Sequence, residues 1–479
     1  MAINAPSGAT SVNALISQLL ALQRRPITDL ETRRGQLDLK NAIFNDVKTK
    51  LTTLKLKANT LAWTGSLSAF ANKTATSSDT GVLTTTAGSS ATNGSHTLFV
   101  SQLAKAHSAA SNRYTKIGTD ISTATTGLKS FDIDVNGSIH TVTVTINAGE
   151  TDETVLGNVA QAINDIAGAD VTAAVVHPTS TTTRLSLSSD RTGTSNQMIF
   201  TDTDGLLGLL GLTNPGAATD TVGGYINADL GGNELDAKFT LDGLNLVRES
   251  NSVSDALTGM TFTLLKAQTA GDPNVTLTVS QDLASIKSKV EEFITAYNDA
   301  YGYVTEKLKI DPTTRTRGEL VGDWGYHDLR LNLRGIVTGI VDSVQAGNPR
   351  LLSEIGITVD GATGTLSLSD SAKFDAAANS GISRIEDLFN SASGVAVRIQ
   401  SLAEGYVGTG GVISGSKTGV TDKIASINRR IEILDQQLAR KEVALRKQFA
   451  SLQQALNAIV QQQTFLNRFL GGTGSLFGG

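Results

Sequence analysis

The chain has 479 residues, with 45 Asp and Glu against 40 Lys and Arg, and it contains no Cys. The lack of Cys excludes disulfides, thiolate metal sites and thiol chemistry. A chain of this length exceeds a single hydrophobic core, so about three domains are expected. Its 39% hydrophobic and 5% aromatic residues favour elongated domains with small cores over a compact enzyme.

The charge is unevenly placed along the chain. Residues 1–62 carry nine Lys and Arg and four Asp and Glu, and residues 421–470 carry eight and four. Residues 63–420 hold 23 basic and 37 acidic side chains. Solvated helix faces explain this distribution most simply. The functional alternative is a pair of basic helical ends that meet an acidic partner or channel.

No stretch approaches the roughly 20 apolar residues that span a bilayer. The first 25 residues have no basic region before their apolar residues, so we expect no secretory signal peptide. These features alone favour a cytoplasmic protein that does not enter a membrane.

The first segment in chain order is helical. Residues 11–22 predict a short amphipathic helix with Ser11 as its N-cap, and Pro26 predicts the start of a second helix. That second helix should run to about Leu61 and end near Gly65. Seven-residue spacing links Leu30, Leu37, Phe44, Leu51 and Ala58, with Val47, Leu54 and Leu61 three residues after the later members.

The central part is rich in Thr, Ser and Gly, and it predicts strands from residues 72–95 onward. Hairpins are expected where Asn-Gly or Asp-Gly lies between alternating arms, because both turn residues must accept positive φ. Three segments fit, with turns at Asn136-Gly137 in 131–146, Asp242-Gly243 in 238–247 and Asp360-Gly361 in 357–369. Residues 155–168 predict a helix packed on the first hairpin sheet, and residues 205–212 predict a turn within a core.

Helical periodicity returns over residues 283–304, and the Gly-rich residues 405–419 predict a flexible joint. The last long helix is expected to begin near Thr421 or Asp422. Its apolar a positions recur every seven residues at Ile424, Ile431, Leu438, Leu445, Leu452, Ile459 and Leu466. Its d positions drift, as expected of a nearly straight helix with about 3.6 residues per turn.

Two long helices at opposite ends of a chain bury such stripes most simply against each other. We therefore predict an α+β, multidomain protein with an elongated helical coiled-coil leg, formed by both chain termini, and inserted β-rich domains. The expected segments are the N-terminal leg helix (1–72), a β domain in two parts (73–125 and 228–282), an inserted β-rich domain (126–227), a helical and mixed leg domain (283–420), and the C-terminal heptad helix with a flexible tail (421–479).

No residue pattern indicates catalysis or a metal centre. Asp132, Asp134, Asn136 and Gly137 match the first half of a calcium loop, but Thr143 stands where the loop needs a Glu ligand. The five His residues lack metal-ligand spacing, and no phosphate-binding loop with its Lys is present. The basic ends lack interleaved aromatics, so nucleic-acid binding is weakly supported. We expect no cofactor, no metal and no nucleic acid.

Several segments resemble the bacterial flagellar filament-capping proteins, a hook-associated protein family. They are residues 14–34, 238–267, 275–301 and 431–466, in the order typical of that family. Residues 131–200 also resemble a small insertion motif of flagellin-like proteins. The chain departs from the family at residues 5–12, where a Gly-rich, Asp-containing turn is only partly matched.

The resemblance implies a structural cap at the distal tip of the filament, assembled as a ring-shaped homo-oligomer, often a pentamer. It implies that leg domains contact flagellin and that the cap promotes folding and insertion of each exported subunit, which prevents its loss to the medium. It also implies export through the flagellar apparatus to an extracellular location. A flagellar export chaperone and the hook–filament junction proteins are further implied partners.

The residues expected to pack the leg or the assembly are the heptad positions Leu37, Phe44, Leu51 and Leu54 and the seven C-terminal a positions given above. One interpretation is that they only hold the leg together within one chain. The other interpretation is that part of the apolar stripe contacts neighbouring subunits or flagellin. An adhesin or glycan-binding protein displayed on the flagellum is the alternative function, and an enzyme is the third class.

Overall fold

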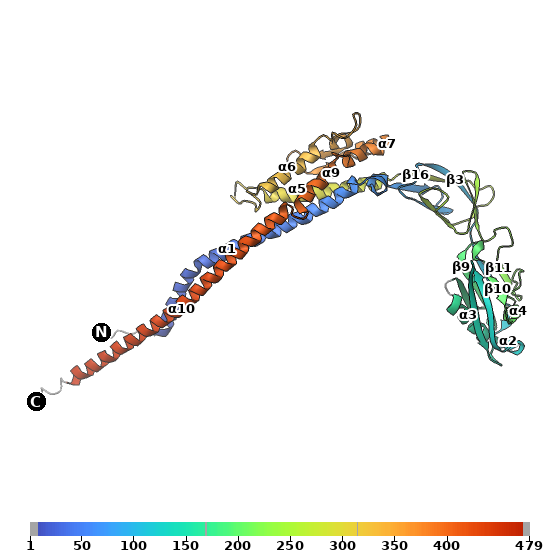
Figure 1. Cartoon of the computed structure of the whole chain (residues 1–479), viewed down its shortest axis with the longest axis horizontal. Coiled ribbons are helices and arrows are strands. Elements are labelled where there is room, and N and C mark those ends of the chain that lie inside the picture. The colour runs from blue at the N-terminus through green and yellow to red at the C-terminus, as the bar shows by residue number, and fades with distance from the viewer. Residues whose placement is uncertain (1–7, 168–169, 314, 473–479) are drawn as a thin grey trace. The chain divides into compact units, whose positions relative to one another are not determined.

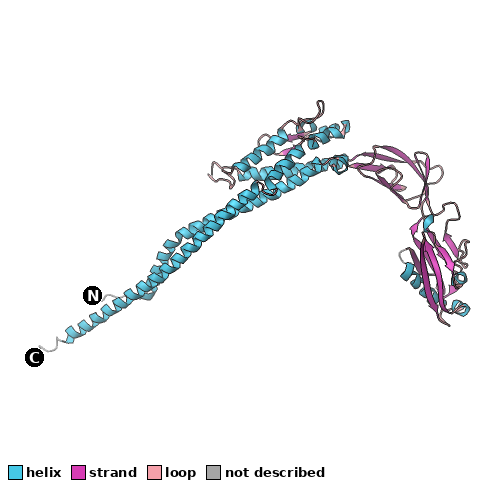
Figure 2. Cartoon of the chain, viewed as in Figure 1, coloured by secondary structure: helices cyan, strands magenta, loops and turns pink. Residues whose placement is uncertain are grey.

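The computed structural model describes residues 8–167, 170–313 and 315–472. The chain forms two compact units. The helical unit comprises Met1–Phe70 and Ile286–Gly479, and the strand unit comprises Ala71–Ser285. Helices dominate the first unit and strands the second (Figure 2).

The helical unit is built around two long helices, α1 (Gly8–Ala62) and α10 (Val412–Gly472), which lie side by side (Figure 1). We call this pair the leg. The other elements are α5 (Leu283–Lys307), α6 (Trp324–Thr338), α7 (Ser371–Ser380), α8 (Ile382–Asn390), α9 (Val395–Val407) and the hairpin of β17 (Ile357–Val359) and β18 (Leu366–Leu368). The predicted helix over residues 283–304 is thereby confirmed, as is the end of the first long helix near Leu61.

The predicted break at Pro26 is wrong, because Pro26 lies inside the continuous helix α1. A Pro inside a helix removes one backbone hydrogen bond and clashes with the preceding turn, which costs about 3 kcal/mol. Ile16 and Ile27 lie on either side of it with only 2% and 1% of their surface exposed. Packing on both sides of Pro26 therefore outweighs the lost bond.

The predicted joint at residues 405–419 is also largely wrong. Helix α9 ends at Val407 and α10 begins at Val412, so only residues 408–411 separate them, and α10 begins about ten residues before the predicted start. Gly415 and Gly419 lie within α10, where Gly costs up to about 1 kcal/mol relative to Ala. The neighbouring Ile413 and Val420 are buried, and this packing holds the segment helical.

The strand unit contains two hydrophobic cores, each with its own sheets. Around the first lie a five-stranded sheet of order β1-β16-β3-β12-β13 and a three-stranded sheet of order β14-β15-β2. The strands are β1 (Lys73–Ser77), β2 (Leu83–Ala87), β3 (Gly94–Gln102), β12 (Ala237–Leu241), β13 (Leu244–Arg248), β14 (Ser252–Val253), β15 (Met260–Leu264) and β16 (Val275–Gln281).

The second core belongs to residues inserted between β3 and β12. One sheet has the order β11-β4-β9-β5, with β8 also paired to β9, and the other has the order β10-β6-β7. The elements are β4 (Ala106–Ala110), β5 (Tyr114–Thr115), α2 (Asp120–Ala124), β6 (Gly127–Val135), β7 (Ser138–Ile146), α3 (Asp152–Ala167), β8 (Val171–Thr179), β9 (Thr182–Thr192), β10 (Ile199–Asp202), α4 (Leu206–Leu210) and β11 (Gly224–Asn227).

Two of the three predicted hairpins have the expected turn. Asn136 and Gly137 have φ of 54° and 81°, and Asp242 and Gly243 have φ of 51° and 83°, as a tight primed turn requires. Helix α3 packs on β7 and β8, which confirms the helix predicted against the first hairpin. Residues 205–212 form α4 and its flanking turns, with four buried Leu side chains, as predicted.

The third hairpin exists, but its predicted two-residue turn is wrong. Residues 360–365 connect β17 and β18. The Asp360 carboxylate accepts hydrogen bonds from the backbone N–H groups of Ala362 and Thr363 at 3.1 and 2.6 Å. The residue with positive φ is Gly364, at 74°, and it lies against the ring of Tyr301. The Asp side chain therefore organises a longer loop instead of occupying a primed turn.

His107 is a fully buried histidine in the second core of the strand unit. Its Nδ1 accepts a hydrogen bond from the backbone N–H of Met198 at 3.2 Å, and its ring meets the ring of Tyr225 edge-on at 4.8 Å. This geometry holds the neutral imidazole. Burial lowers the pKa of His107 to about 4, because the charged form would lose its hydration.

Candidate assembly surface on the helical leg

Two side-chain contacts fix how α1 and α10 face each other. Lys417 Nζ donates to Asn45 Oδ1 at 2.7 Å, and Arg34 Nη1 donates to Asn428 Oδ1 at 3.5 Å. In both pairs the two residue numbers add up to 462, so the helices run antiparallel in a constant register. By this register, Gly8 at the start of α1 faces Gln454, and no residue of α1 lies opposite the later residues of α10.

The predicted N-terminal positions lie in two environments. Leu37 is half-buried on the part of α1 that faces α10. Phe44, Leu51 and Leu54 are fully buried, and the Phe44 ring stacks on Tyr326 of α6 at a centroid distance of 5.5 Å. Helices α8 and α9 also pack on α1. Much of the apolar stripe of α1 therefore lies in a helical bundle and not against α10 alone.

Polar contacts fasten α1 to the same bundle. Tyr303 of α5 donates to Asp46 at 2.7 Å, and Lys57 Nζ lies 2.8 Å from Glu292 of α5. Lys55 pairs with Glu404 of α9. Hydrogen bonds from Lys57 and Lys289 lower the pKa of Glu292, so this carboxylate stays charged at neutral pH. These three contacts join α1 to α5 and α9 beside its buried apolar stripe.

The predicted C-terminal positions fall into two groups that differ in burial, and the change occurs where α10 reaches the start of α1. The first four, Ile424, Ile431, Leu438 and Leu445, are half-buried along the face of α10 that meets α1. The last three, Leu452, Ile459 and Leu466, are 54%, 56% and 54% exposed. Leu452 faces the first turn of α1 by the register above, and Ile459 and Leu466 lie past it.

The exposed end of α10 carries an apolar stripe made of Leu452, Leu456, Ile459, Val460 and Leu466. We call it the tip stripe. Between Lys447 and Arg468 the sequence contains no charged residue. A helix with exposed aliphatic side chains at helical spacing and no charge is poorly suited to solvent, so this end is a candidate intermolecular surface.

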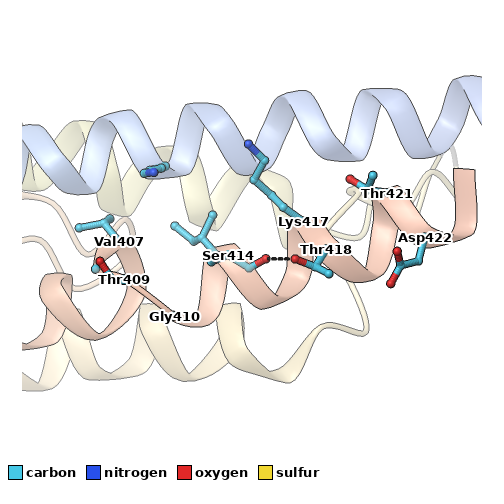
Figure 3. Close-up of a pocket in the computed structure, with 11 residues that line it drawn as sticks. Val407, Thr409, Gly410, Ser414, Lys417, Thr418, Thr421 and Asp422 are labelled. Carbon is cyan, nitrogen blue, oxygen red and sulfur yellow. Dashed lines mark hydrogen bonds between the residues drawn. The ribbon is translucent and has the colours of Figure 1, made fainter. Parts of the chain in front are cut away.

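A pocket of about 520 Å³ lies where α9 turns into α10 (Figure 3). It is lined by Lys48 of α1, the turn residues Gly408, Thr409 and Gly410, and the first turns of α10. The Thr418 hydroxyl donates a hydrogen bond to the Ser414 carbonyl at 3.1 Å, drawn as a dashed line in Figure 3. Its polar lining consists of lysine and hydroxyl side chains and the carboxylate of Asp422.

The tight turn at residues 408–411 was not predicted. Gly410 has φ of 74°, and a Cβ on Gly411 would come within 2.7 Å of the Tyr406 carbonyl oxygen. The run Gly408-Thr409-Gly410-Gly411 was the available signal, since a turn this close needs Gly. In the described part of the chain, no group of three or more His, Asp or Glu side chains could hold a metal ion. Nor does any helix there have the length and apolar character to cross a membrane.

Comparisons with known proteins identify the family. The model of the flagellar hook-associated protein 2 N-terminus matches residues 9–107, and that of the C-terminus matches residues 235–461. The A-type flagellar hook-associated protein 2 of Pseudomonas aeruginosa is 26% identical over 475 residues, covering 96% of this chain and 95% of the relative. The flagellar hook-associated protein 2 of Escherichia coli K12 is 25% identical, with 95% of each chain covered.

A solved structure shows the same fold. The crystal structure of the D1-D2-D3 domains of the flagellar cap protein FliD from Escherichia coli superimposes with a TM-score of 0.60. The two are 24% identical in sequence, and the match covers 79% of this chain and 99% of that chain.

Proposed function

The chain belongs to the flagellar hook-associated protein 2 family, whose members cap the bacterial flagellar filament, and from this premise we propose how its leg works in the cap. The protein is a structural component of the flagellum, located at its extracellular tip. The comparisons give no support to the adhesin alternative. The family is not known as an enzyme family.

We propose that the cap is a ring-shaped homo-oligomer, a pentamer, that promotes folding and insertion of exported flagellin. The protein would reach the tip through the flagellar export apparatus, with an export chaperone and the hook–filament junction proteins as further partners. The observation that supports this proposal is the division of the α10 stripe. Its half-buried residues hold the leg, and its exposed tip stripe is left for other chains of the assembly.

Exposure of the tip stripe to water is energetically unfavourable. Five aliphatic side chains lie on one side of a charge-free helix end, where burial of each would contribute about 1.5–3 kcal/mol if complete. A partner helix with the same spacing would bury them without any charge to desolvate. The leg would thus present its tip to helical segments of neighbouring chains.

Deletion of the gene tests the function. We expect short or absent filaments and unpolymerised flagellin in the medium, and purified protein added outside the cells should restore filament growth. Filaments of normal length in the deletion strain would contradict the cap function. Light scattering of the purified protein at increasing concentration tests the ring, and a monomer at every concentration would contradict it.

A further inference from the structure

Strand β7 lies at the edge of its sheet, and only one of its two sides is paired. The order of the sheet is β10-β6-β7, so β6 borders β7 on one side. The tight turn at Asn136-Gly137 joins Val135 and Ser138 as a hydrogen-bonded pair, and bonded pairs alternate with unbonded ones along an antiparallel ladder. The main-chain groups that point away from β6 are therefore those of Ile139, Thr141, Thr143 and Thr145. We call these four positions the free edge.

The main-chain groups of the free edge have no partner in the described part of the chain. None of the four residues there makes a hydrogen bond to a loop, a helix or a side chain. All four are exposed, Ile139 by 67%. Buried main-chain N–H and C=O groups are almost always paired, so these unpaired groups face water. Helix α3 joins the core on the inner side of the sheet, together with Val142 and Val144.

The other edge strands have features that discourage pairing with a second chain. Among the strands that the structure describes, every edge strand except β7 and β8 has five residues or fewer. β8 has nine residues, but Pro178 lacks an N–H and the register with β9 is irregular after Val176. β7 also has nine residues, in unbroken register with β6, and contains no Lys, Arg, Pro or Gly. Short length, Pro, charge and bulges protect edges in natural proteins, so this long open edge indicates a pairing site.

We propose that the free edge of β7 pairs with the free edge of a second copy of the chain, antiparallel and about a two-fold axis. The free edge is centred on Val142. The two-fold axis therefore places Ile139 against Thr145, and Thr141 against Thr143, in both directions. Each of these pairs can exchange two hydrogen bonds. The two three-stranded sheets would become one continuous sheet.

Charge and symmetry select a second copy as the partner. The only titratable side chain of β7 is His140, whose Nε2 lies 2.8 Å from Asp170 of its own chain, so a copy brings no like charge against the strand. Asp132 and Asp134 lie on β6, three strand spacings or about 14 Å from their counterparts in the pair, which exceeds the screening length of about 10 Å at 0.1 M. A copy also supplies an edge of identical length that matches by symmetry.

This contact differs from the contact that repeats around a ring. A two-fold contact closes after two copies, whereas a ring repeats a head-to-tail contact. The pairing of β7 would join two chains, or two rings, through their strand units. The inference therefore goes beyond the proposed function and does not depend on it.

Charged substitutions at the central pair test the partner and the register. The basic variant carries Thr141→Lys and Thr143→Lys, and the acidic variant carries Thr141→Glu and Thr143→Glu, each in the full-length chain. Pairing within one variant sets like charges opposite each other, whereas pairing between the two variants sets opposite charges together. Matched controls carry the same substitutions at Thr84 and Thr86, which are exposed two residues apart on the short edge strand β2.

The mass in solution is measured by light scattering, after each variant has shown an unfolding transition like that of the unaltered protein. At a concentration where the unaltered protein is paired, we expect each charged variant alone to have half its mass. An equal mixture of the two variants should recover the full mass, and the control variants should keep it. A ring that persists in the charged variants leaves the proposed function intact.

Amide hydrogen exchange of the unaltered protein is the second readout. The four amides of the free edge should exchange fast in dilute solution and slow by about tenfold where pairing is nearly complete. Fast exchange at every concentration would overturn the inference, as would equal masses for the unaltered protein and both charged variants. Slow exchange already in the dilute monomer would overturn it too, since the edge would then be covered within the chain. A mixture that fails to recover the full mass would contradict the second copy as partner.

Discussion

Lys417 of α10 and Asn45 of α1 meet through a 2.7 Å hydrogen bond, 372 residues apart in the chain. Their contact and that of Arg34 with Asn428 define one antiparallel register along the leg. The register determines which part of α10 faces α1 and which part does not. The division of the leg into a packing part and an exposed tip follows from it.

Crosslinking checks the register. The chain has no Cys, so Asn45→Cys combined with Lys417→Cys introduces the only two thiols. A short bis-maleimide reagent should join them within a monomer. The control pair, Asn45→Cys with Arg429→Cys, places the second thiol about 18 Å further along the helix and should stay unjoined. Efficient joining of the control pair would refute the register.

Two heptad positions should differ sharply in their effect on stability. Phe44 is 1% exposed and stacks on Tyr326, so Phe44→Ala should lower the free energy of unfolding of the helical unit by about 3–5 kcal/mol. Leu466 is 54% exposed, so Leu466→Ala should change it by no more than about 0.5 kcal/mol. Denaturant titration measures both, and similar effects would contradict the assigned burial.

Pro26→Ala should stabilise the helical unit. The substitution restores an N–H that can bond to the Leu22 carbonyl within α1, and Ala is the best helix former. We expect the free energy of unfolding to rise by about 1–3 kcal/mol, seen as a higher melting temperature by circular dichroism. A lower melting temperature would contradict this and would mean that the Pro26 ring itself contributes to the packing of α1.

His107 should make the strand unit sensitive to acid. Its pKa is about 4 in the folded chain, below the ordinary value of 6.5, so between these values the unfolded chain binds more protons. The stabilising effect of neutral His107 is fully present above pH 6.5 and is lost as the pH falls to about 4. The loss amounts to about 3 kcal/mol. Denaturant titrations at pH 7 and pH 4 measure it.

The control for the acid effect is His107→Gln, which keeps an acceptor for the Met198 N–H but does not titrate in this range. Its stability should depend much less on pH between 6.5 and 4. An equally steep loss in the variant would show that other groups cause the acid sensitivity.

Local signals in the sequence predicted the features that depend on local geometry. Asn136-Gly137 and Asp242-Gly243 predicted tight turns correctly, because positive φ restricts the residue type at such turns. The expectations failed where tertiary packing outweighs local preference. Pro26 and the pair Gly415 and Gly419 lie inside helices because buried neighbours hold those segments.

The candidate surfaces were only partly predictable. Heptad spacing identified Leu452, Ile459 and Leu466, but it could not show that they are exposed while Leu445 is half-buried. That difference depends on the register between α1 and α10, which two polar contacts reveal.

A triple substitution in the tip stripe, Leu452→Ser, Ile459→Ser and Leu466→Ser, tests whether this end of α10 contacts other chains. The variant must first show the same unfolding transition as the unaltered protein. Two quantities are then measured: the mass of the oligomer and the amount of flagellin retained by cells that carry the variant. If the tip stripe contacts other chains, at least one of the two should fall well below the unaltered value. If both match the unaltered protein, the tip stripe makes no contact in the assembly, and the proposed division of the leg is contradicted.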